Sequence, residues 1–416
     1  MIFKMRNFFN SLLPGLYLFG FTLGTGSVTA MANAGADYGM ALLWAVFLSC
    51  IITFTLIHLY GKFALVTGET ALSAFRKHIH PAIGIFFIIA LTAHVCGSII
   101  GVMGIISDLS YEWSKTYFDQ GIRPTYFAGF YILLVYGIFL QGETQFFKQV
   151  LAVVVAVMAI SFLINFIVFM PSPVEIVKGL IPVVPETTPD QNPFLLIASI
   201  VGTTVFSGLF ILRTTLVHEA GWTFKDLRIQ RRDALFSVFM MFIVSASVMA
   251  AATGTLHLHG TRLEDSSQMV TLLEPLIGLF AMSIFTLGMI AAGISSQFPN
   301  VTLTPYLLDD YNRVKPNMRQ WKYRFLVLAL SLLGLMVPLL KAPPVAVMVT
   351  SQAFGALILP VTVACLMFLG NKKVLMKEHV FTWKTNTVLT LILVFSFIMS
   401  YMSFSGLLST LLRIIG

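Results

Sequence analysis

Long runs of apolar residues dominate this sequence from its first segment to its last. Eleven stretches have about the 20 predominantly apolar residues that an α-helix needs to cross the hydrocarbon core of a bilayer. We expect these spans at residues 12–37, 39–60, 82–107, 124–141, 148–170, 193–217, 234–256, 271–297, 323–341, 343–369 and 385–412. Hydrophobic residues make up 57% of the chain and charged residues only 11%, a balance outside the range of soluble domains. The sequence therefore predicts an all-α integral membrane protein.

The basic residues of the loops predict how the chain is oriented. With the N-terminus inside, 19 Lys and Arg residues lie on the cytoplasmic side and 6 on the other, with Arg213 inside a span. This bias predicts a multi-pass protein of the cell membrane (inner or plasma membrane) with a cytoplasmic N-terminus and an external C-terminus. The net charge of +8 then reports topology, and no nucleic acid partner is expected. The expected partners are the lipid bilayer and a small ion, and we expect a monomer, with an oligomer left open.

Two of the spans carry weak helix formers near their centres. The first contains "GFTLGTGSVTA" (20–30) and the sixth contains "VGTTVFSGLFIL" (201–212), five spans later. Paired interruptions in two halves of a membrane chain are typical of inverted-repeat transporters whose binding site lies at the midplane. A free backbone at that depth is tolerated only where it lines a cavity or is buried in protein. A packing notch for a neighbouring helix is the alternative for either span alone.

The same segments resemble a known family. Residues 34–79 resemble the first-to-second-span region of the Nramp divalent-metal transporters, residues 201–220 resemble their sixth span, and "AAGISSQ" (291–297) resembles their eighth. The resemblance implies a LeuT-type fold: a 5+5 inverted repeat with discontinuous helices 1 and 6, and 11 transmembrane helices in all. It implies a single transmembrane domain over 1–416, with repeat one at about 12–170, repeat two at about 193–369 and an extra helix at about 385–412.

The chain departs from this family at the metal-binding motifs. The family carries Asp-Pro-Gly-Asn in span one and Met-Pro-His in span six. The matching positions here, which we take as the candidate substrate-binding residues, are Gly24, Thr25, Gly26 and Ser27, and Phe206, Ser207 and Gly208. A dication leaving water needs anionic oxygen ligands, and every acidic residue falls in a loop or near a span end. No metal site and no cofactor are therefore predicted.

The charged or ionisable groups expected at depth are positive or can become so. Arg213 takes a family histidine position beyond the span-six break, and His94 takes a family acidic position linked to proton movement in span three. Arg213 is a charge candidate, because charges inside spans are rare and usually functional. The alternative is that it snorkels to the cytoplasmic surface. His94 is a candidate proton carrier or anion partner, with a hydrogen-bonded packing role as the alternative.

The glycine motif favours an anion independently of those charges. The second half of span one begins near Ser27, and the start of a half-helix offers free N–H groups and a positive dipole end. Gly24 and Gly26 allow close approach to the backbone, while Thr25 and Ser27 can donate hydroxyl hydrogen bonds. The motif also resembles the Gly-x-Gly turn by which amino-acid transporters of this fold hold a substrate carboxylate.

Coupling is predicted to use Na⁺ or H⁺. Ser295 and Ser296 lie where transporters of the LeuT type often supply hydroxyl ligands to Na⁺, although serines also pack helix against helix. His94 offers the proton route instead.

The leading prediction is an ion-coupled secondary transporter of a small anion, bicarbonate or a short carboxylate, working by alternating access. The first alternative is a divergent transporter of Mg²⁺ or Mn²⁺, and the second is a non-transporting sensor. No enzyme is predicted, because the sequence holds no nucleophile–base pair, phosphate loop or cofactor motif in the right context.

Overall fold

The computed structural model describes residues 24–141, 160, 162–164, 166–167, 171–187, 192–272, 281–314 and 317–415. These residues form helices joined by loops, and no β-strand occurs among them. The prediction of an all-α protein is confirmed. The predicted spans at 12–37, 148–170 and 271–297 fall partly outside the described residues, so the half of span one before Gly24 is not described.

The described helices follow the apolar stretches of the sequence closely. Their bounds are α2 (Thr25–Tyr38), η1 (Gly39–Leu42), α3 (Leu43–Thr67), α4 (Ala71–His78), α5 (Pro81–Ser114), α6 (Pro124–Gln141), α8 (Pro173–Gly179), α9 (Pro193–Thr204), α10 (Ser207–Glu219), η2 (Phe224–Asp226), α11 (Leu227–Thr255), η3 (His257–His259), η4 (Ser266–Leu272), α13 (Ala281–Asn312), α14 (Trp321–Leu332), η6 (Leu333–Leu335), α15 (Met336–Leu340), α16 (Pro344–Gly370), α17 (Lys373–Met376), η7 (Lys377–His379) and α18 (Trp383–Ile415). Within the described ranges, eight helical stretches are long and apolar enough to cross a membrane.

Both predicted interruptions coincide with helix boundaries. α9 ends at Thr204 and α10 begins at Ser207, so two non-helical residues divide span six. Gly24 precedes α2 in an extended conformation, with φ −89° and ψ −177°. The break in span six is thus present, and in the described part of span one a helix begins at the predicted position.

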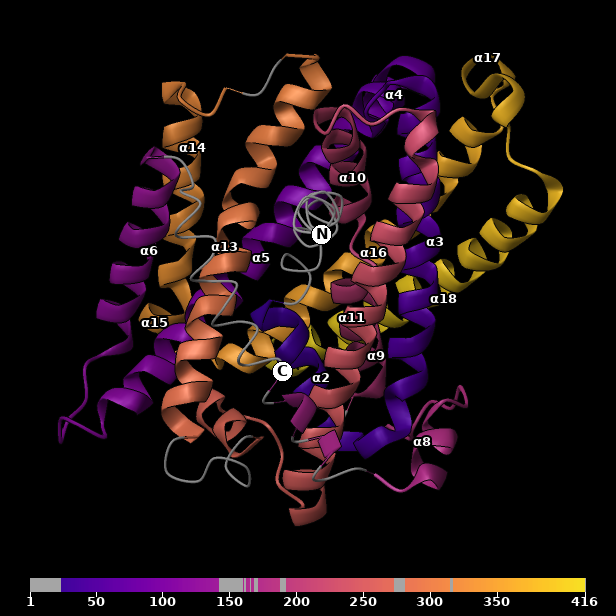
Figure 1. Cartoon of the computed structure of the whole chain (residues 1–416). Helices are drawn as coiled ribbons and strands as arrows, with labels where there is room; N and C mark the ends of the chain where they lie inside the picture. The colour runs from indigo at the N-terminus through magenta and orange to yellow at the C-terminus, as the bar shows by residue number, and fades with distance from the viewer. Residues whose placement is uncertain are drawn as a thin grey trace, which may run out of the picture.

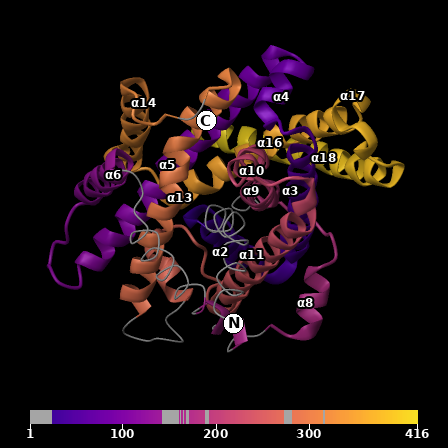
Figure 2. The ribbon, with the colours of Figure 1, turned by 45° about the horizontal axis from the view of Figure 1, so that its top comes forward.

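The divided helices lie inside the bundle. α2, α9 and α10 are enclosed by α3, α5, α11, α13 and α16, while α6 with α14 and α17 with α18 lie on opposite flanks (Figures 1 and 2). α9 packs directly against α16, where a Cβ added at Gly202 would lie 1.9 Å from the backbone oxygen of Gln352. This contact between backbones requires glycine and holds α16 against the break.

The flanks carry the surface that suits a lipid environment. Tyr126, Phe130 and Leu133 of α6 and Leu391 and Tyr401 of α18 are largely exposed. Such apolar side chains are stable next to acyl chains rather than water. α4 and α17 lie at one end of the bundle and α8 at the other (Figure 1). This agrees with the predicted sides of their loops, while the direction of the chain across the membrane stays a prediction.

Candidate functional site

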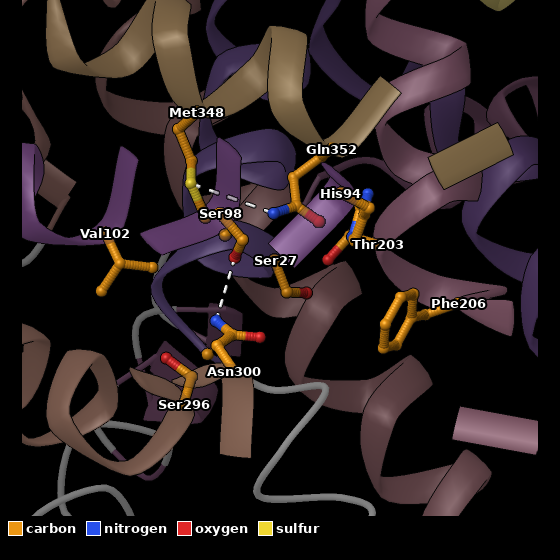
Figure 3. Close-up of a pocket in the computed structure, with 12 residues that line it drawn as sticks. Ser27, His94, Ser98, Val102, Thr203, Phe206, Ser296, Asn300, Met348 and Gln352 are labelled. Carbon is orange, nitrogen blue, oxygen red and sulfur yellow. Dashed lines mark hydrogen bonds between the residues drawn. The ribbon is translucent and has the colours of Figure 1, made fainter. Parts of the chain in front are cut away.

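A small cavity lies where α2 begins and where span six is divided. It offers about 40 Å³ to the centres of water-sized molecules, and one water needs roughly 10–15 Å³. The space therefore suits one small ion with little accompanying water. Its lining residues come from five helices and the break (Figure 3): Gly24, Gly26, Ser27, His94, Ser98, Val102, Thr203, Phe206, Ser296, Asn300, Met348 and Gln352.

Two helix N-termini border the cavity. Gly24 is the N-cap of α2 and Phe206 is the N-cap of α10; both line the cavity, and neither cap forms a side-chain hydrogen bond. The first turns of both helices lack acidic residues. Helix starts present N–H groups without intrahelical partners and a positive dipole end. These two helix starts supply partial positive charge, while α9 ends at Thr204 next to the cavity with the opposite end of its dipole. Among the described residues, no carboxylate lines the cavity.

Close packing explains why glycine occupies the second helical position of α2. A Cβ added at Gly26 would lie 2.4 Å from Cε of Met348 and 2.8 Å from Nε2 of Gln352. α16 therefore closes over the first turn of α2, and its two side chains form one wall of the cavity (Figure 3).

Amide and hydroxyl side chains on α5, α13 and α16 give the cavity polar groups. Nδ2 of Asn300 donates to Oγ of Ser98 at 3.1 Å, which links α13 to α5. Nε2 of Gln352 points to Sδ of Met348 at 3.9 Å. The hydroxyl of Ser296 donates to the carbonyl of Ala292 at 2.9 Å, within its own helix.

An aromatic pair limits the cavity on its remaining side. The rings of His94 and Phe206 are stacked, with centroids 4.8 Å apart and planes 27° apart. The ring of Phe206 lies over Gly208, where an added Cβ would be 2.4 Å from its Cζ. His94 is only 4% exposed, so the imidazole faces the cavity within a dry part of the bundle.

The structure brings many of the predicted site residues together. Those that line the cavity are Gly24, Gly26, Ser27, His94, Phe206 and Ser296. The first turn of α2 and the break in span six thus meet at one cavity, as the two interrupted spans were expected to do.

The other predicted residues next to the cavity turn away from it. The hydroxyl of Ser207 accepts a hydrogen bond from Thr362 at 2.7 Å. Thr25 faces α13, where its Oγ1 lies 3.3 Å from the Cβ position at Gly293. Ser295 donates to a carbonyl of its own helix, and Gly208 supports the ring of Phe206. These residues therefore pack behind the residues that line the cavity.

Arg213 is not at the cavity. It is fully buried, and its Nη1 donates to Oδ2 of Asp233 at 2.6 Å. Nη2 also donates to the backbone oxygen of Gln230 at 3.3 Å, and the guanidinium lies over the ring of Trp222. The side chain therefore does not snorkel to the surface, and its charge is balanced locally by a carboxylate of α11.

Half of the lining was missed by sequence reasoning. The additional residues are Ser98, Val102, Thr203, Asn300, Met348 and Gln352. Asn300 and Gln352 had a usable signal, because carboxamides inside apolar spans usually face the interior of a bundle. The other four residues could be found only once the packing of the helices was known.

Comparison with known proteins identifies the family. The family model described as "Natural resistance-associated macrophage protein-like" (Nramp) matches residues 18–405. The chain belongs to the Nramp family. The prediction of a membrane transporter that is not an enzyme is thereby confirmed, and the chain is a secondary transporter of the Nramp type.

Relatives and solved structures agree with this assignment. The chain is 26% identical over 361 residues to the divalent metal cation transporter MntH of Klebsiella pneumoniae, covering 84% of this chain and 83% of that protein. It is 24% identical over 362 residues to MntH of Acidiphilium cryptum, covering 84% of this chain and 80% of that protein. A manganese transporter of Eremococcus coleocola superposes with a TM-score of 0.77 at 15% identity, covering 99% of this chain and 89% of that one.

More distant structures share the same architecture. Mhp1, a nucleobase-cation-symport-1 family transporter, has a TM-score of 0.56 at 15% identity, covering 97% of this chain and 90% of that one. A Na⁺-coupled sialic acid symporter has a TM-score of 0.62 at 10% identity, covering 93% of this chain and 88% of that one. The predicted LeuT-type fold is confirmed.

Within the described part of this Nramp chain, the cavity lining contains no acidic residue. Among the described residues, no group of three or more His, Cys, Asp or Glu side chains could hold a metal ion. The cavity offers one imidazole, one thioether and neutral oxygens, from residues such as His94, Met348 and Asn300. The family's fold is retained around a lining of different chemistry.

Proposed function

We propose that this Nramp-family transporter moves a small oxyanion, hydrogencarbonate or a short carboxylate, by alternating access together with Na⁺ or H⁺. The observation that carries the proposal is a cavity bordered by two helix N-termini without side-chain caps, with no carboxylate among the described residues that line it. Helix N-termini are established anion-binding elements, because their N–H groups and dipole ends favour negative charge.

The charge balance of the cavity favours an anion over a dication. Mg²⁺ and Mn²⁺ prefer anionic oxygen ligands, which offset the cost of leaving water. Here the lining supplies hydroxyls, amides and partial positive charge, and the carboxylate of Asp233 is taken by Arg213. The helix N-termini would stabilise a bound monoanion, so the site does not need a buried cationic side chain.

The size of the cavity limits the substrate. Phe206 occupies the position where the family places a methionine, and its ring narrows the space beside His94. A cavity of about 40 Å³ for water-sized centres accommodates a planar anion of about four heavy atoms, which excludes bulky carboxylates.

Divalent cation transport is the second candidate function. The relatives are named divalent metal cation transporters, and the amide oxygens of Asn300 and Gln352 are possible neutral ligands. A partly hydrated Mg²⁺ or Mn²⁺ could use them, since Mg²⁺ often keeps several waters when it binds.

Uptake into proteoliposomes separates the two functions. The purified full chain should accumulate radiolabelled hydrogencarbonate or formate under an inward Na⁺ or proton gradient, and Mn²⁺ should neither enter nor compete. Uptake of Mn²⁺ or Mg²⁺, without anion uptake under either gradient, would establish the second candidate and reject the first.

Variants connect uptake to the cavity. Ser27→Ala removes a hydroxyl of the lining and should lower anion uptake several-fold, consistent with the net value of one hydrogen bond to a charged group. Thr302→Val is the matched control, because Thr302 lies on α13 near Asn300 but bonds only carbonyls of its own helix. Equal uptake by both variants would remove Ser27 from the site.

A further inference from the structure

The cavity contains hydrogen-bond acceptors as well as donors. Nδ2 of Asn300 is committed to Ser98 at 3.1 Å, so Oδ1 lies on the other side of the amide, toward the open space (Figure 3). Nε2 of Gln352 is directed to Sδ of Met348, so Oε1 likewise lies on the opposite side of its amide. Two amide oxygens, from α13 and α16, thus belong to a lining whose other side is formed by helix starts.

The donors lie between these two amides. Figure 3 shows the side chain of Ser27, from the first turn of α2, between Asn300 and Gln352. A simple anion has acceptor atoms only. It could satisfy the helix N–H groups and Ser27, but its remaining oxygen would face an amide oxygen, which places two lone pairs in contact.

We propose that the cavity selects an oxyanion that carries its own O–H group, such as hydrogencarbonate, and that Asn300 and Gln352 are the residues that select it. The proposal rests on the anion transport proposed above. The anionic oxygens of the substrate face the start of α2, and its O–H donates to an amide oxygen on α13 or α16.

The preference for an oxyanion with an O–H group depends on how these two amides are oriented. The orientation of Asn300 is set by its bond to Ser98 in a buried setting, and turning the amide would require the hydroxyl of Ser98 to change from acceptor to donor. A site arranged to accept a hydrogen bond from its substrate rejects the analogue that lacks the donor, since the buried acceptor is then left unpaired.

Nitrate is the matched probe for this proposal. It is a planar monoanion with four heavy atoms, like hydrogencarbonate, but has no O–H group. Reconstituted full chain should take up hydrogencarbonate at alkaline pH at least about tenfold better than isotopically labelled nitrate, which is the ratio expected when one buried acceptor is left unpaired. Excess nitrate should inhibit hydrogencarbonate uptake only weakly.

Two variants test the residues themselves. Asn300→Leu and Gln352→Met remove one amide oxygen each while keeping similar volume. Each should reduce the preference for hydrogencarbonate over nitrate several-fold, mainly by lowering hydrogencarbonate uptake. Thr302→Val should leave the ratio unchanged, because Thr302 bonds only its own helix.

The outcomes separate this proposal from the one on which it rests. Equal uptake of the two anions by the unmodified protein, or a ratio unchanged in both variants, would overturn the selection while leaving anion transport standing. Absence of uptake of both anions, with transport of Mn²⁺ or Mg²⁺, would overturn both. The comparison of hydrogencarbonate uptake with nitrate uptake needs only the unmodified protein, so the proposal does not depend on whether the variants fold.

Discussion

The imidazole of His94 and the ring of Phe206 are stacked at a centroid distance of 4.8 Å, across the boundary between α5 and the break in span six. The sequence resemblance places Phe206 at the family's sulfur position in span six and His94 at its acidic position in span three. The two departures are therefore in contact with one another. The stack joins a bundle helix to the break, so the width of the cavity depends on both residues.

Removing this ring should widen the range of accepted substrates. Phe206→Ala leaves space beside His94, and a pocket changed by a side chain of this size alters discrimination by about tenfold or more. We expect uptake of acetate to rise relative to formate, measured by competition in proteoliposomes. Phe210→Leu, at a buried ring of α10 outside the cavity lining, is the control. An unchanged acetate-to-formate ratio in Phe206→Ala would show that the ring does not limit substrate size.

The backbone contact between α9 and α16 should be intolerant of any side chain. In Gly202→Ala the new Cβ would lie 1.9 Å from the backbone oxygen of Gln352, so one helix must shift. Overpacking of this kind costs about 1–3 kcal/mol. The thermal midpoint in detergent should therefore fall, and uptake should fall with it. Gly129→Ala on α6, where no atom lies within 4 Å of the added Cβ, should be neutral. A midpoint in Gly202→Ala equal to that of Gly129→Ala would contradict this packing.

Most of the fold was predictable because bilayer thickness imposes a simple rule on sequence. Apolar stretches of about 20 residues predict helices regardless of neighbours. The break at Val205 and Phe206 was also predictable, since glycine, serine and threonine gather there. Helix ends were less so: α5 extends to Ser114 and α13 to Asn312, beyond the predicted apolar stretches, because polar residues continue a helix once it has formed.

The site was predictable only in part. The family motifs identified Gly24, Ser27 and Phe206, because local sequence marks the two helix starts. Asn300 and Gln352 lie in regular helices, and the sequence alone does not define which face of each helix meets the break. Arg213 was singled out from the sequence, but its partner was not. Its pairing with a carboxylate 20 residues away depends on the packing of α10 against α11.

The buried pair of Arg213 and Asp233 should behave differently from a surface pair. Arg213→Met removes the guanidinium from the buried carboxylate of Asp233, and breaking a buried ion pair costs about 3–5 kcal/mol. The double variant Arg213→Met/Asp233→Leu removes both charges and should recover most of the thermal stability. Lys115→Met, at the partly exposed pair with Glu112, should change stability by about 0–1 kcal/mol. A double variant no more stable than Arg213→Met would contradict a simple pairing role.

The linker between α3 and α4 should be sensitive to acid. Burial alone would raise the pKa of Glu69, but hydrogen bonds from Lys77 and His78 outweigh it and lower the pKa below its usual range. A lowered pKa in the folded state means that Glu69 stabilises the protein above its unfolded pKa and loses this contribution as the pH falls through the folded value. Thermal midpoints of the unmodified protein and Glu69→Gln should therefore differ at neutral pH and converge in acid. A constant difference would contradict the assignment.

Variants of Ser296 and His94 should show whether Na⁺ or H⁺ is the coupling ion. Ser296 lines the cavity on α13 beside the start of α2, and its hydroxyl oxygen can still accept a cation while its proton bonds Ala292. His94 lies on the other wall and is the one residue with an ionisable side chain among the described residues of the lining. If Na⁺ is the coupling ion, Ser296→Ala should raise the Na⁺ concentration needed for half-maximal uptake about tenfold, and His94→Gln should leave it unchanged. If H⁺ is the coupling ion, His94→Gln should abolish the stimulation by a proton gradient and Ser296→Ala should preserve it. Uptake by both variants, measured under a Na⁺ gradient and under a proton gradient, decides between the two coupling ions. If both variants keep the dependence of the unmodified protein on each gradient, the coupling ion binds elsewhere.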